Sequence, residues 1–308
     1  MRKKITIIGA GNVGASTAQL VAKEGIADVM LFDIAEGIPQ GKALDIAEAC
    51  PLWGSAVSVK GTNNYADTKN SDIVVITAGF PRKPNMSRDD LLHANADVVK
   101  AASQAIAKNS PNAIIIVVTN PMDAMAQLAW KTTEFSCRRV MGMGGILDAA
   151  RFRTFLAWEL NVSPEDIEAM LLGGHGDQMV PLPRFTTVKG IPVGEILKKK
   201  TLGALIQRTR SGGAEIVGLL KSGSAYYAPA AATFQMIKSI LLDEKRVLPC
   251  AAYLNGEYGV KDLYVGVPVV LGKEGVEKVV EIKLTRDEKT LFRASCTAVR
   301  KLVKKLAI

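Results

Sequence analysis

Short apolar runs alternate with helical stretches throughout the first half of the chain. The runs are hydrophobic and rich in Val and Ile, and they lie at residues 5–8, 29–32, 71–79, 113–119 and, more weakly, 57–60 and 139–143. Runs of this kind are typical of parallel strands that are buried on both faces. Helices are expected between the first runs at 15–23 and at 37–50, where Pro51 should stop the second helix. The alternation over residues 1–145 predicts a doubly wound parallel sheet of the Rossmann type.

The second half of the chain has a different pattern. Its expected elements are a strand at 167–172, short strands at 181–193, helices at 202–220, 226–242 and 286–306, and strands at 247–253 and 263–271. Asn255-Gly256, between the last two strands, is typical of an antiparallel hairpin. This mixture predicts an α+β substrate domain with antiparallel strands. Because 308 residues exceed the size at which one core stops growing, we expect two domains, one at 1–145 and one at 146–308.

Composition and charge exclude several classes of protein. Hydrophobic residues make up 48% of the chain and charged residues 22%, as in an ordinary globular enzyme, and no apolar run is long enough to span a membrane. Cys50, Cys137, Cys250 and Cys296 stand far apart, and only two histidines are present, so we expect a reduced, cytoplasmic protein without a metal site. The net charge of +9 is spread along the chain without an aromatic-rich basic patch. We therefore expect neither a nucleic acid nor a membrane as partner, although a positive field could attract anionic substrates.

A glycine-rich motif directly follows the first apolar run. Residues 9–14 read Gly-Ala-Gly-Asn-Val-Gly, with a strand before them and a helix after them, and Asp33 ends the next strand. The glycines let backbone N–H groups approach a pyrophosphate, and a carboxylate at Asp33 accepts hydrogen bonds from the adenosine ribose while it repels a 2′-phosphate. The pattern predicts a dinucleotide site that prefers NAD to NADP, so residues 1–145 are the expected NAD-binding domain and residues 146–308 the expected catalytic domain. The alternative is a glycine turn in an unrelated strand–helix unit.

The ligand cleft of such a sheet lies beyond the carboxyl ends of its strands, so the segment after the strand at 71–79 is informative. Residues 80–90 form a polar loop with three cations, among them Arg82 and Arg88. These cations either lie in solvent or recognise a carboxylate, for which the planar guanidinium is well suited. Ser87 and Asp90 have the spacing of a capping box, which predicts the start of a helix.

Four polar side chains are candidates for a reaction centre. The amide of Asn120, in the turn before Pro121, either contacts a substrate or stabilises that turn. His175 stands between glycines after an apolar run, where a packed or surface histidine is the alternative to a proton-transfer group. Asp148 and Arg151 share one helix face, and a surface ion pair is the alternative there. Together, an Asp that orients an imidazole and an Arg that binds a carboxylate are typical of a proton-transfer site for a carboxylic acid.

This set of motifs resembles the L-lactate/L-malate dehydrogenase family, and most closely its lactate-dehydrogenase-like malate branch in bacteria. The resemblance covers essentially the whole chain, and the segments that carry it are 9–14, 33, 77–92, 118–123, 147–155, 172–184 and 222–232. Several independent motifs in the right order make it highly specific. It implies an oxidoreductase that transfers a hydride between NAD and a 2-hydroxy acid.

The resemblance also implies residue roles. His175 would be the acid/base and Asp148 its orienting partner. Arg151 would hold the carboxylate next to the reacting carbon, Arg88 would polarise the carbonyl, and Asn120 would donate a hydrogen bond near the reacting oxygen. The residues implied to contact NAD are Gly9, Gly11, Asn12, Val13, Gly14, Asp33, Asn95, Val118 and Asn120.

Two positions bear on the choice of substrate. In this family a Gln at the position of Arg82 favours pyruvate, whereas an Arg pairs with the second carboxylate of oxaloacetate. Such a charge-assisted pair, when desolvated, favours the dianion by roughly 2–5 kcal/mol. Ala225 stands where lactate enzymes carry a bulkier Thr, which leaves room for the longer substrate. Both positions imply L-malate and oxaloacetate as the substrate pair, in the tricarboxylic acid cycle.

Alternatives stay open at this point. One is an L-lactate or other 2-hydroxy-acid dehydrogenase, and another is a nicotinamide-sensing protein that has lost catalysis. Gln178 and Gly144 depart from the commonest residues of relatives and leave fine specificity and local rigidity open. The family implies a homo-oligomer, either a tetramer or a dimer.

Overall fold

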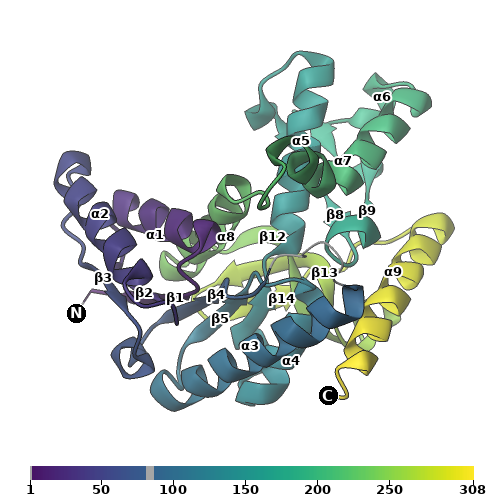
Figure 1. Cartoon of the computed structure of the whole chain (residues 1–308). Helices are drawn as coiled ribbons and strands as arrows, with labels where there is room; N and C mark the ends of the chain where they lie inside the picture. Colours follow the sequence, from purple (N-terminus) through teal and green to yellow (C-terminus); the bar gives the residue numbers. More distant parts are fainter. Residues whose placement is uncertain (1, 81–86) are drawn as a thin grey trace.

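One continuous nine-stranded sheet runs through the protein (Figure 1). The computed structural model describes residues 2–80 and 87–308. Six parallel strands lie in the order β3-β2-β1-β4-β5-β6. Their bounds are β1 (Lys4–Ile8), β2 (Asp28–Phe32), β3 (Val59–Thr62), β4 (Ile73–Ile76), β5 (Ile114–Val117) and β6 (Val140–Gly142). This is the strand order of a Rossmann dinucleotide-binding sheet, so the fold predicted from the apolar runs is confirmed.

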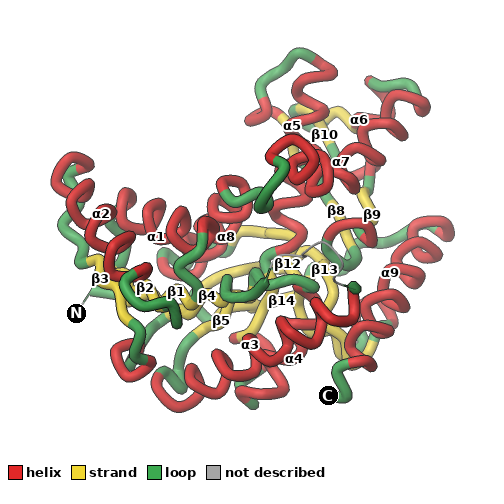
Figure 2. Tube along the Cα trace, in the orientation of Figure 1, coloured by secondary structure: helices red, strands yellow, loops and turns green. Residues whose placement is uncertain are grey.

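Helices cover both faces of this parallel sheet. Figures 1 and 2 show α1 (Asn12–Glu24) and α2 (Ile38–Trp53) on one face and α3 (Arg88–Asn109) and α4 (Met122–Thr133) on the other. Every residue of β4 and β5 is buried as a result. A strand covered on both sides needs apolar side chains at consecutive positions, which explains the continuous hydrophobic runs in the sequence.

The end of α2 differs from the sequence expectation. Pro51 lies inside the helix, which continues to Trp53. The backbone bonds that close this helix do not use the missing N–H of proline, because Gly54 N donates to Pro51 O at 3.3 Å and Ser55 N donates to Cys50 O at 2.9 Å. Gly54 has φ 70°, a left-handed conformation that glycine adopts at little cost, so glycine rather than proline ends the helix.

Three antiparallel strands from the second half of the chain extend the parallel sheet beyond β6. They are β12 (Arg246–Asn255), β13 (Lys261–Gly272) and β14 (Gly275–Val279). The join is antiparallel, with Ala251 of β12 opposite Gly142 of β6. The expected pairing of the two long strands is confirmed, but a 3₁₀ turn at Glu257–Gly259 lengthens their connection beyond Asn255-Gly256. The predicted α+β half is confirmed, whereas its domain boundary at residue 145 stays a prediction.

The remaining elements build a second layer above one part of the sheet (Figures 1 and 2). Its helices are α5 (Gly144–Leu160), α6 (Val193–Ile196) and α7 (Lys199–Leu220), whereas α8 (Tyr227–Leu241) lies beside α1 on the sheet (Figure 1). The apolar run at 167–172 is split into β7 (Ile167–Glu168) and β8 (Leu171–Leu172), which pair in different sheets, so the single strand expected there is wrong. β7 pairs with β10 (Thr187–Val188), which also pairs with β11 (Ile191–Pro192), while β8 pairs with β9 (Val180–Pro181).

The last helix, α9 (Arg286–Lys305), packs beside α4 and the β8–β9 hairpin. Thr285 and Glu288 form a capping box at its start, and its buried side chains include Phe292, Ser295 and Val299. One apolar core unites the two halves of the chain, with Ile7 and Val75 in the parallel strands and Val267 in β13. Within residues 2–80 and 87–308, no helix has the length and apolar character needed to cross a membrane.

Candidate active site

The glycine motif forms a tight loop between β1 and α1. Gly9 has φ 108°, and a Cβ atom there would lie 2.6 Å from the backbone nitrogen of Ala78. A Cβ atom on Gly14 would collide with the carbonyl oxygen of Gly9, so this pair lets the helix pack closely on the sheet. Gly11 is different, because no heavy atom of residues 2–80 and 87–308 lies within 4 Å of its Cβ position. The motif is thus packed at its two ends and open in the middle.

The open middle coincides with the amino end of α1. Gly11 is the N-cap residue, no side chain caps the helix, and no acidic residue occupies its first turn. The backbone N–H groups around Asn12 and Val13 therefore face the position at which a pyrophosphate binds in such loops. This arrangement fits a dinucleotide.

Asp33 follows β2, beside the glycine loop. Its Oδ2 atom accepts a hydrogen bond from Ala10 N at 2.7 Å, and Oδ1 accepts from Ala35 N at 3.0 Å. These bonds hold the carboxylate against the loop. Lys42 of α2 also contacts the glycine loop, because its Nζ atom donates a hydrogen bond to Ala10 O at 2.8 Å. Sequence reasoning missed Lys42, which carries no recognisable motif spacing.

Asn95, Val118 and Asn120 meet at the carboxyl ends of β4 and β5. Asn95 of α3 is buried, its Oδ1 accepts from Phe80 N at 2.7 Å, and its Nδ2 donates to Asn120 O at 2.7 Å. The side chain therefore ties two strand-end loops together, and a direct contact of Asn95 with NAD stays a prediction. Val118 N donates to Ile76 O at 2.9 Å. Asn120 is exposed, and its bond to Pro121 is cis.

The basic loop after β4 is described only in part. Arg82 lies outside the described residues. Arg88 begins α3, and its side chain also lies outside what the structure describes. The predicted capping box is confirmed, because Asp90 N donates to Ser87 Oγ at 3.0 Å and Ser87 N donates to Asp90 Oδ2 at 3.1 Å. Hydrogen bonding to Ser87 also lowers the pKa of the Asp90 carboxyl.

His175 projects from a loop between β8 and β9. Gly173 and Gly176 on either side of it have φ 86° and 83°, conformations that reverse the chain direction and that favour glycine. The Nδ1 atom of His175 lies 2.8 Å from Oδ2 of Asp148 in α5. The side chain of Asp148 is only 2% exposed and that of His175 is 13% exposed. The structure therefore brings the predicted imidazole and its predicted carboxylate partner into contact in a largely dry site.

Arg151 completes this cluster from the next turn of α5. Its NH1 atom lies 3.4 Å from Oδ1 of Asp148, so both carboxylate oxygens of Asp148 face a partner. Burial lowers the pKa of Arg151, while the Asp148 carboxylate raises it. The arginine packs on two glycines of α7, since the Cβ position of Gly212 lies 3.1 Å from Arg151 Cδ and that of Gly213 lies 3.7 Å from NH2. The glycine pair is thus a close-packing site and does not break the helix.

Opposing effects act on the protonation of His175. Burial lowers its pKa, but the charge and the hydrogen bond of Asp148 raise it, and the net shift is upward from the ordinary value. Arg151 opposes protonation of the ring, and the carboxylate of Asp123 favours it. A histidine with this environment holds a proton at neutral pH more readily than a free imidazole does.

Two further positions named from the sequence, Ala225 and Gly144, lie in different parts of the fold. Ala225 is half-buried in the segment that joins α7 and α8. Gly144 begins α5 and packs on the histidine, since its Cβ position lies 2.9 Å from His175 Cβ. A larger side chain at position 144 would press on His175. This contact explains why a glycine fits here.

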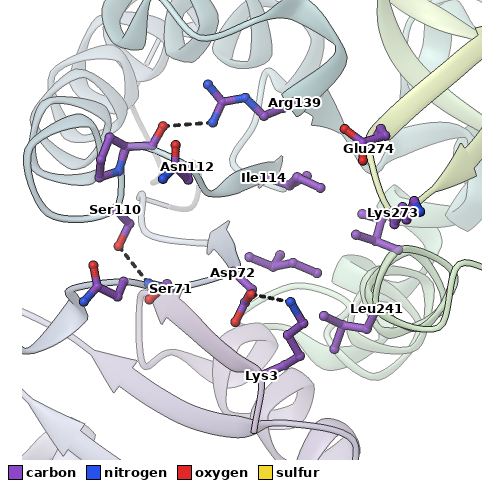
Figure 3. Close-up of a pocket in the computed structure, with 14 residues that line it drawn as sticks. Lys3, Ser71, Asp72, Ser110, Asn112, Ile114, Arg139, Leu241, Lys273 and Glu274 are labelled. Carbon is purple, nitrogen blue, oxygen red and sulfur yellow. Dashed lines mark hydrogen bonds and ion pairs between the residues drawn. The ribbon is translucent and has the colours of Figure 1, made fainter. Parts of the chain in front are cut away.

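A separate cavity of about 430 Å³ lies at the amino ends of β4 and β5 (Figure 3). Lys3, Asp72, Ser110 and Arg139 are among its lining residues. Lys3 Nζ pairs with Asp72 Oδ1 at 2.8 Å, and Arg139 NH1 donates to Pro111 O at 2.9 Å. None of the predicted site residues lines this cavity, which lies at the opposite end of the parallel strands from Gly9 and Asn120.

Comparisons with known proteins agree over nearly the entire chain. Residues 3–142 match the family model for the lactate/malate dehydrogenase NAD binding domain, and residues 146–307 match the model for the lactate/malate dehydrogenase alpha/beta C-terminal domain. A malate dehydrogenase of Roseiflexus castenholzii is 57% identical over 299 residues, which cover 97% of each chain.

Solved structures give the same result. The crystal structure of Cryptosporidium parvum malate dehydrogenase is similar with a TM-score of 0.97 and 47% identity, and the match covers 100% of this chain and 99% of that one. A lactate dehydrogenase from the same organism, complexed with lactic acid and nicotinamide adenine dinucleotide, has a TM-score of 0.97 and 42% identity, with 100% and 98% covered.

Proposed function

The chain belongs to the lactate/malate dehydrogenase family, and we propose that it is an NAD-dependent malate dehydrogenase that interconverts L-malate and oxaloacetate. The observation that carries this proposal is the contact between His175 and Asp148, with Arg151 one helical turn away. A proton carrier and a carboxylate-binding cation lie side by side there. The family relationship supports the same chemistry.

NAD fits the glycine loop, where Gly11 leaves open space at an uncapped helix end and Asp33 supplies a carboxylate for the ribose. When bound, NAD supplies the nicotinamide carbon that accepts a hydride from the alcohol carbon of malate. We propose that Gly9, Gly11, Asn12, Val13 and Gly14 form the pyrophosphate loop. Val118, Asn95 and Asn120 would line the nicotinamide side.

His175 is the acid/base in this proposal. Its Nδ1 faces Asp148, so proton exchange with the substrate falls to Nε2. The neutral imidazole takes the proton of the malate hydroxyl group, while the carbon that bears this hydroxyl gives up a hydride to NAD. The product is oxaloacetate. The imidazolium that forms is stabilised by the Asp148 carboxylate. In the reverse direction, protonated His175 donates to the carbonyl oxygen as the hydride arrives.

The arginines position the dianionic substrate. Arg151, already buried beside Asp148, would bind the carboxylate next to the reacting carbon in the bidentate manner that suits a guanidinium. Arg88 would polarise the carbonyl, and Asn120 would donate to the same oxygen. Arg82 would pair with the second carboxylate, and this residue together with Ala225 favours malate over lactate.

We also propose that the enzyme is a cytoplasmic homo-oligomer, either a tetramer or a dimer. Family membership supports the oligomer, and four cysteines without disulfide partners agree with a reducing compartment. Malate and oxaloacetate would place the enzyme in the tricarboxylic acid cycle. Neither a nucleic acid nor a membrane is expected as a partner.

The direct test follows the absorbance of NADH with purified protein. L-Malate with NAD should form NADH, and oxaloacetate should consume it. His175→Gln, which keeps a polar side chain of similar reach but cannot carry the proton, should lose turnover by at least about 10²-fold and still bind NADH. A variant as active as the wild type would refute the acid/base assignment, and a wild-type protein inactive with both substrates would refute the proposed function.

A further inference from the structure

The backbone on both sides of His175 is held by side chains from distant parts of the chain. Ordinary ladder bonds stop at Gly173, whose N–H and C=O pair with Gly266 of β13 at 2.9 and 3.1 Å. The next two backbone N–H groups, of Gly174 and His175, donate to side chains of α9 and α4. The position of the imidazole therefore depends on residues that belong neither to its own loop nor to the helix of Asp148.

Ser295 of α9 closes this loop with one hydroxyl group. Its Oγ atom accepts from Gly174 N at 2.8 Å and donates to Gln178 O at 2.7 Å. The two bonds connect the residue before His175 with the residue three positions after it. Ser295 is only 2% exposed, and a Cβ atom on Gly173 would lie 2.5 Å from its oxygen, so the hydroxyl fills a gap between the two ends of the loop.

Asp123, in the first turn of α4, holds the histidine itself. Its Oδ2 atom accepts from His175 N at 2.9 Å. Its Oδ1 atom is buried and has no hydrogen-bond partner among the described residues. A buried, incompletely paired carboxylate costs stability, so its presence against the histidine backbone points to a role other than stability.

We propose that Ser295 and Asp123 are positioning residues that fix the backbone around His175 and so keep its imidazole in register with Asp148. The proposal rests on the proposed function and adds two residues to it. Small displacements matter for such a site, because a shift of about 1 Å in a reacting group can cost about 100-fold in rate. The hydrogen bonds of both residues go to the backbone of the loop, so both position the ring through the loop, and Asp123 adds its charge.

Charge adds to the effect of geometry at Asp123. Among the described side chains, the charged groups that act on His175 are Asp148 and Arg151 from α5 and Asp123 from α4, and the carboxyl of Asp123 also acts on the thiol of Cys296 in α9. Burial raises the pKa of Asp123 to about 6, while the backbone N–H and charge of His175 lower it. Its ionised form therefore supports the imidazolium of His175.

Two variants separate positioning from simple structural support. Ser295→Ala removes the hydroxyl, and Asp123→Leu removes the acceptor of the His175 N–H together with the charge while it keeps the approximate size of the side chain. Thr297→Ala is the matched control, because its exposed hydroxyl lies on the same helix and donates to Arg293 O, away from the loop. The chain has only one other histidine, His93, which is exposed on α3 and serves as an internal reference.

The readouts are the imidazole pKa of His175 from NMR of histidine-labelled protein, and kcat for oxaloacetate with the KM for NADH. Both test variants should lower the ring pKa of His175 and reduce kcat about 10- to 100-fold, with the KM for NADH within about twofold. The control should match the wild type in both readouts.

An unchanged His175 pKa and kcat in both test variants, with only the melting temperature lowered, would overturn the proposal. Should Ser295→Ala fail to fold, Asp123→Leu carries the same test from the other side of the loop. The NMR readout needs no turnover. A wild type inactive with oxaloacetate would therefore refute the proposed function, whereas unshifted ring titrations refute the positioning roles.

Discussion

The Nδ1 atom of His175 lies 2.8 Å from Oδ2 of Asp148, although one residue stands in a loop after β8 and the other in the first half of α5. Each carboxylate oxygen of Asp148 has its own partner, because Oδ2 faces His175 and Oδ1 faces Arg151. One buried carboxylate thus sets the tautomer of the histidine and holds the arginine nearby. The site can therefore keep an imidazole and a guanidinium close together without leaving two cations unopposed.

Asp148→Asn should lower kcat for oxaloacetate reduction by about 10²- to 10⁴-fold, because an amide neither fixes the same tautomer nor stabilises the imidazolium. The melting temperature should also fall, because Arg151 then stays buried without its carboxylate partner. Steady-state kinetics with NADH, beside a thermal scan, measure both. Activity within threefold of the wild type would contradict the assigned role of Asp148.

The upward shift of the His175 pKa predicts how the rates of the two reaction directions depend on pH. Reduction needs the protonated ring and should persist above the ordinary histidine pKa of about 6.5, then fall as pH rises through the raised pKa. Oxidation of malate needs the neutral ring and should rise over the same interval. Profiles of kcat/KM in both directions test this, with Asp148→Asn expected to move each limb to lower pH. Profiles that change at the same pH in the wild type and in Asp148→Asn would show that the contact between His175 and Asp148 does not control the pH dependence.

The raised pKa of Asp123 predicts that the stability difference between the wild type and Asp123→Asn depends on pH. Its folded-state pKa of about 6 exceeds the unfolded value of about 3.8, so the folded state binds the proton more tightly and the stabilisation is lost as pH rises through 6. The shift of about two pH units corresponds to roughly 3 kcal/mol. Relative to wild type, Asp123→Asn should therefore gain stability between pH 4 and pH 7. Urea unfolding at both pH values measures this gain, and a constant difference would show that Asp123 titrates normally.

Gly212 predicts a change in substrate binding without a loss of stability. A Cβ atom at this position would press on Arg151 Cδ at 3.1 Å, while alanine favours the helix by up to about 1 kcal/mol. Gly212→Ala should raise the KM for oxaloacetate about 3- to 10-fold and keep the KM for NADH. Gly218→Ala is the matched control, because its Cβ position in the same helix is open. Equal KM values in the two variants would show that α7 does not position Arg151.

Asp33→Ser should relax the preference for NAD. The carboxylate is fixed by Ala10 and Ala35, so it cannot turn away from a 2′-phosphate. Its removal should raise kcat/KM with NADPH at least about 10-fold relative to NADH, since a fixed negative charge no longer opposes the phosphate. A ratio that does not move would exclude Asp33 from the ribose site.

Patterns of neighbouring residues in the sequence were enough to predict much of the secondary structure. The continuous apolar runs identified the parallel strands, and the spacing of Ser87 and Asp90 identified the start of α3. What sequence reasoning missed depends on contacts between distant residues. Nothing around Ser295 indicates that its hydroxyl meets Gly174 and Gln178.

The wrong expectations have equally local causes. Pro51 was expected to end α2, but a proline in the last turn removes only the one hydrogen bond that its own N–H would donate to Ala47 O, and the helix continues until Gly54 ends it. The run at 167–172 looks like one strand because its apolar residues are adjacent, whereas tertiary pairing divides it between two sheets. Periodicity shows which residues are buried and leaves their partners open.

The central claim, a dehydrogenase selective for the dicarboxylate, is tested most directly by the ratio of kcat/KM for oxaloacetate to that for pyruvate, measured with NADH. The wild type should favour oxaloacetate by at least about 10²-fold, because one desolvated charge pair at Arg82 is worth roughly 2–5 kcal/mol. Arg82→Gln should move the ratio strongly toward pyruvate. A wild-type preference for pyruvate, or a ratio unaffected by Arg82→Gln, would contradict the account.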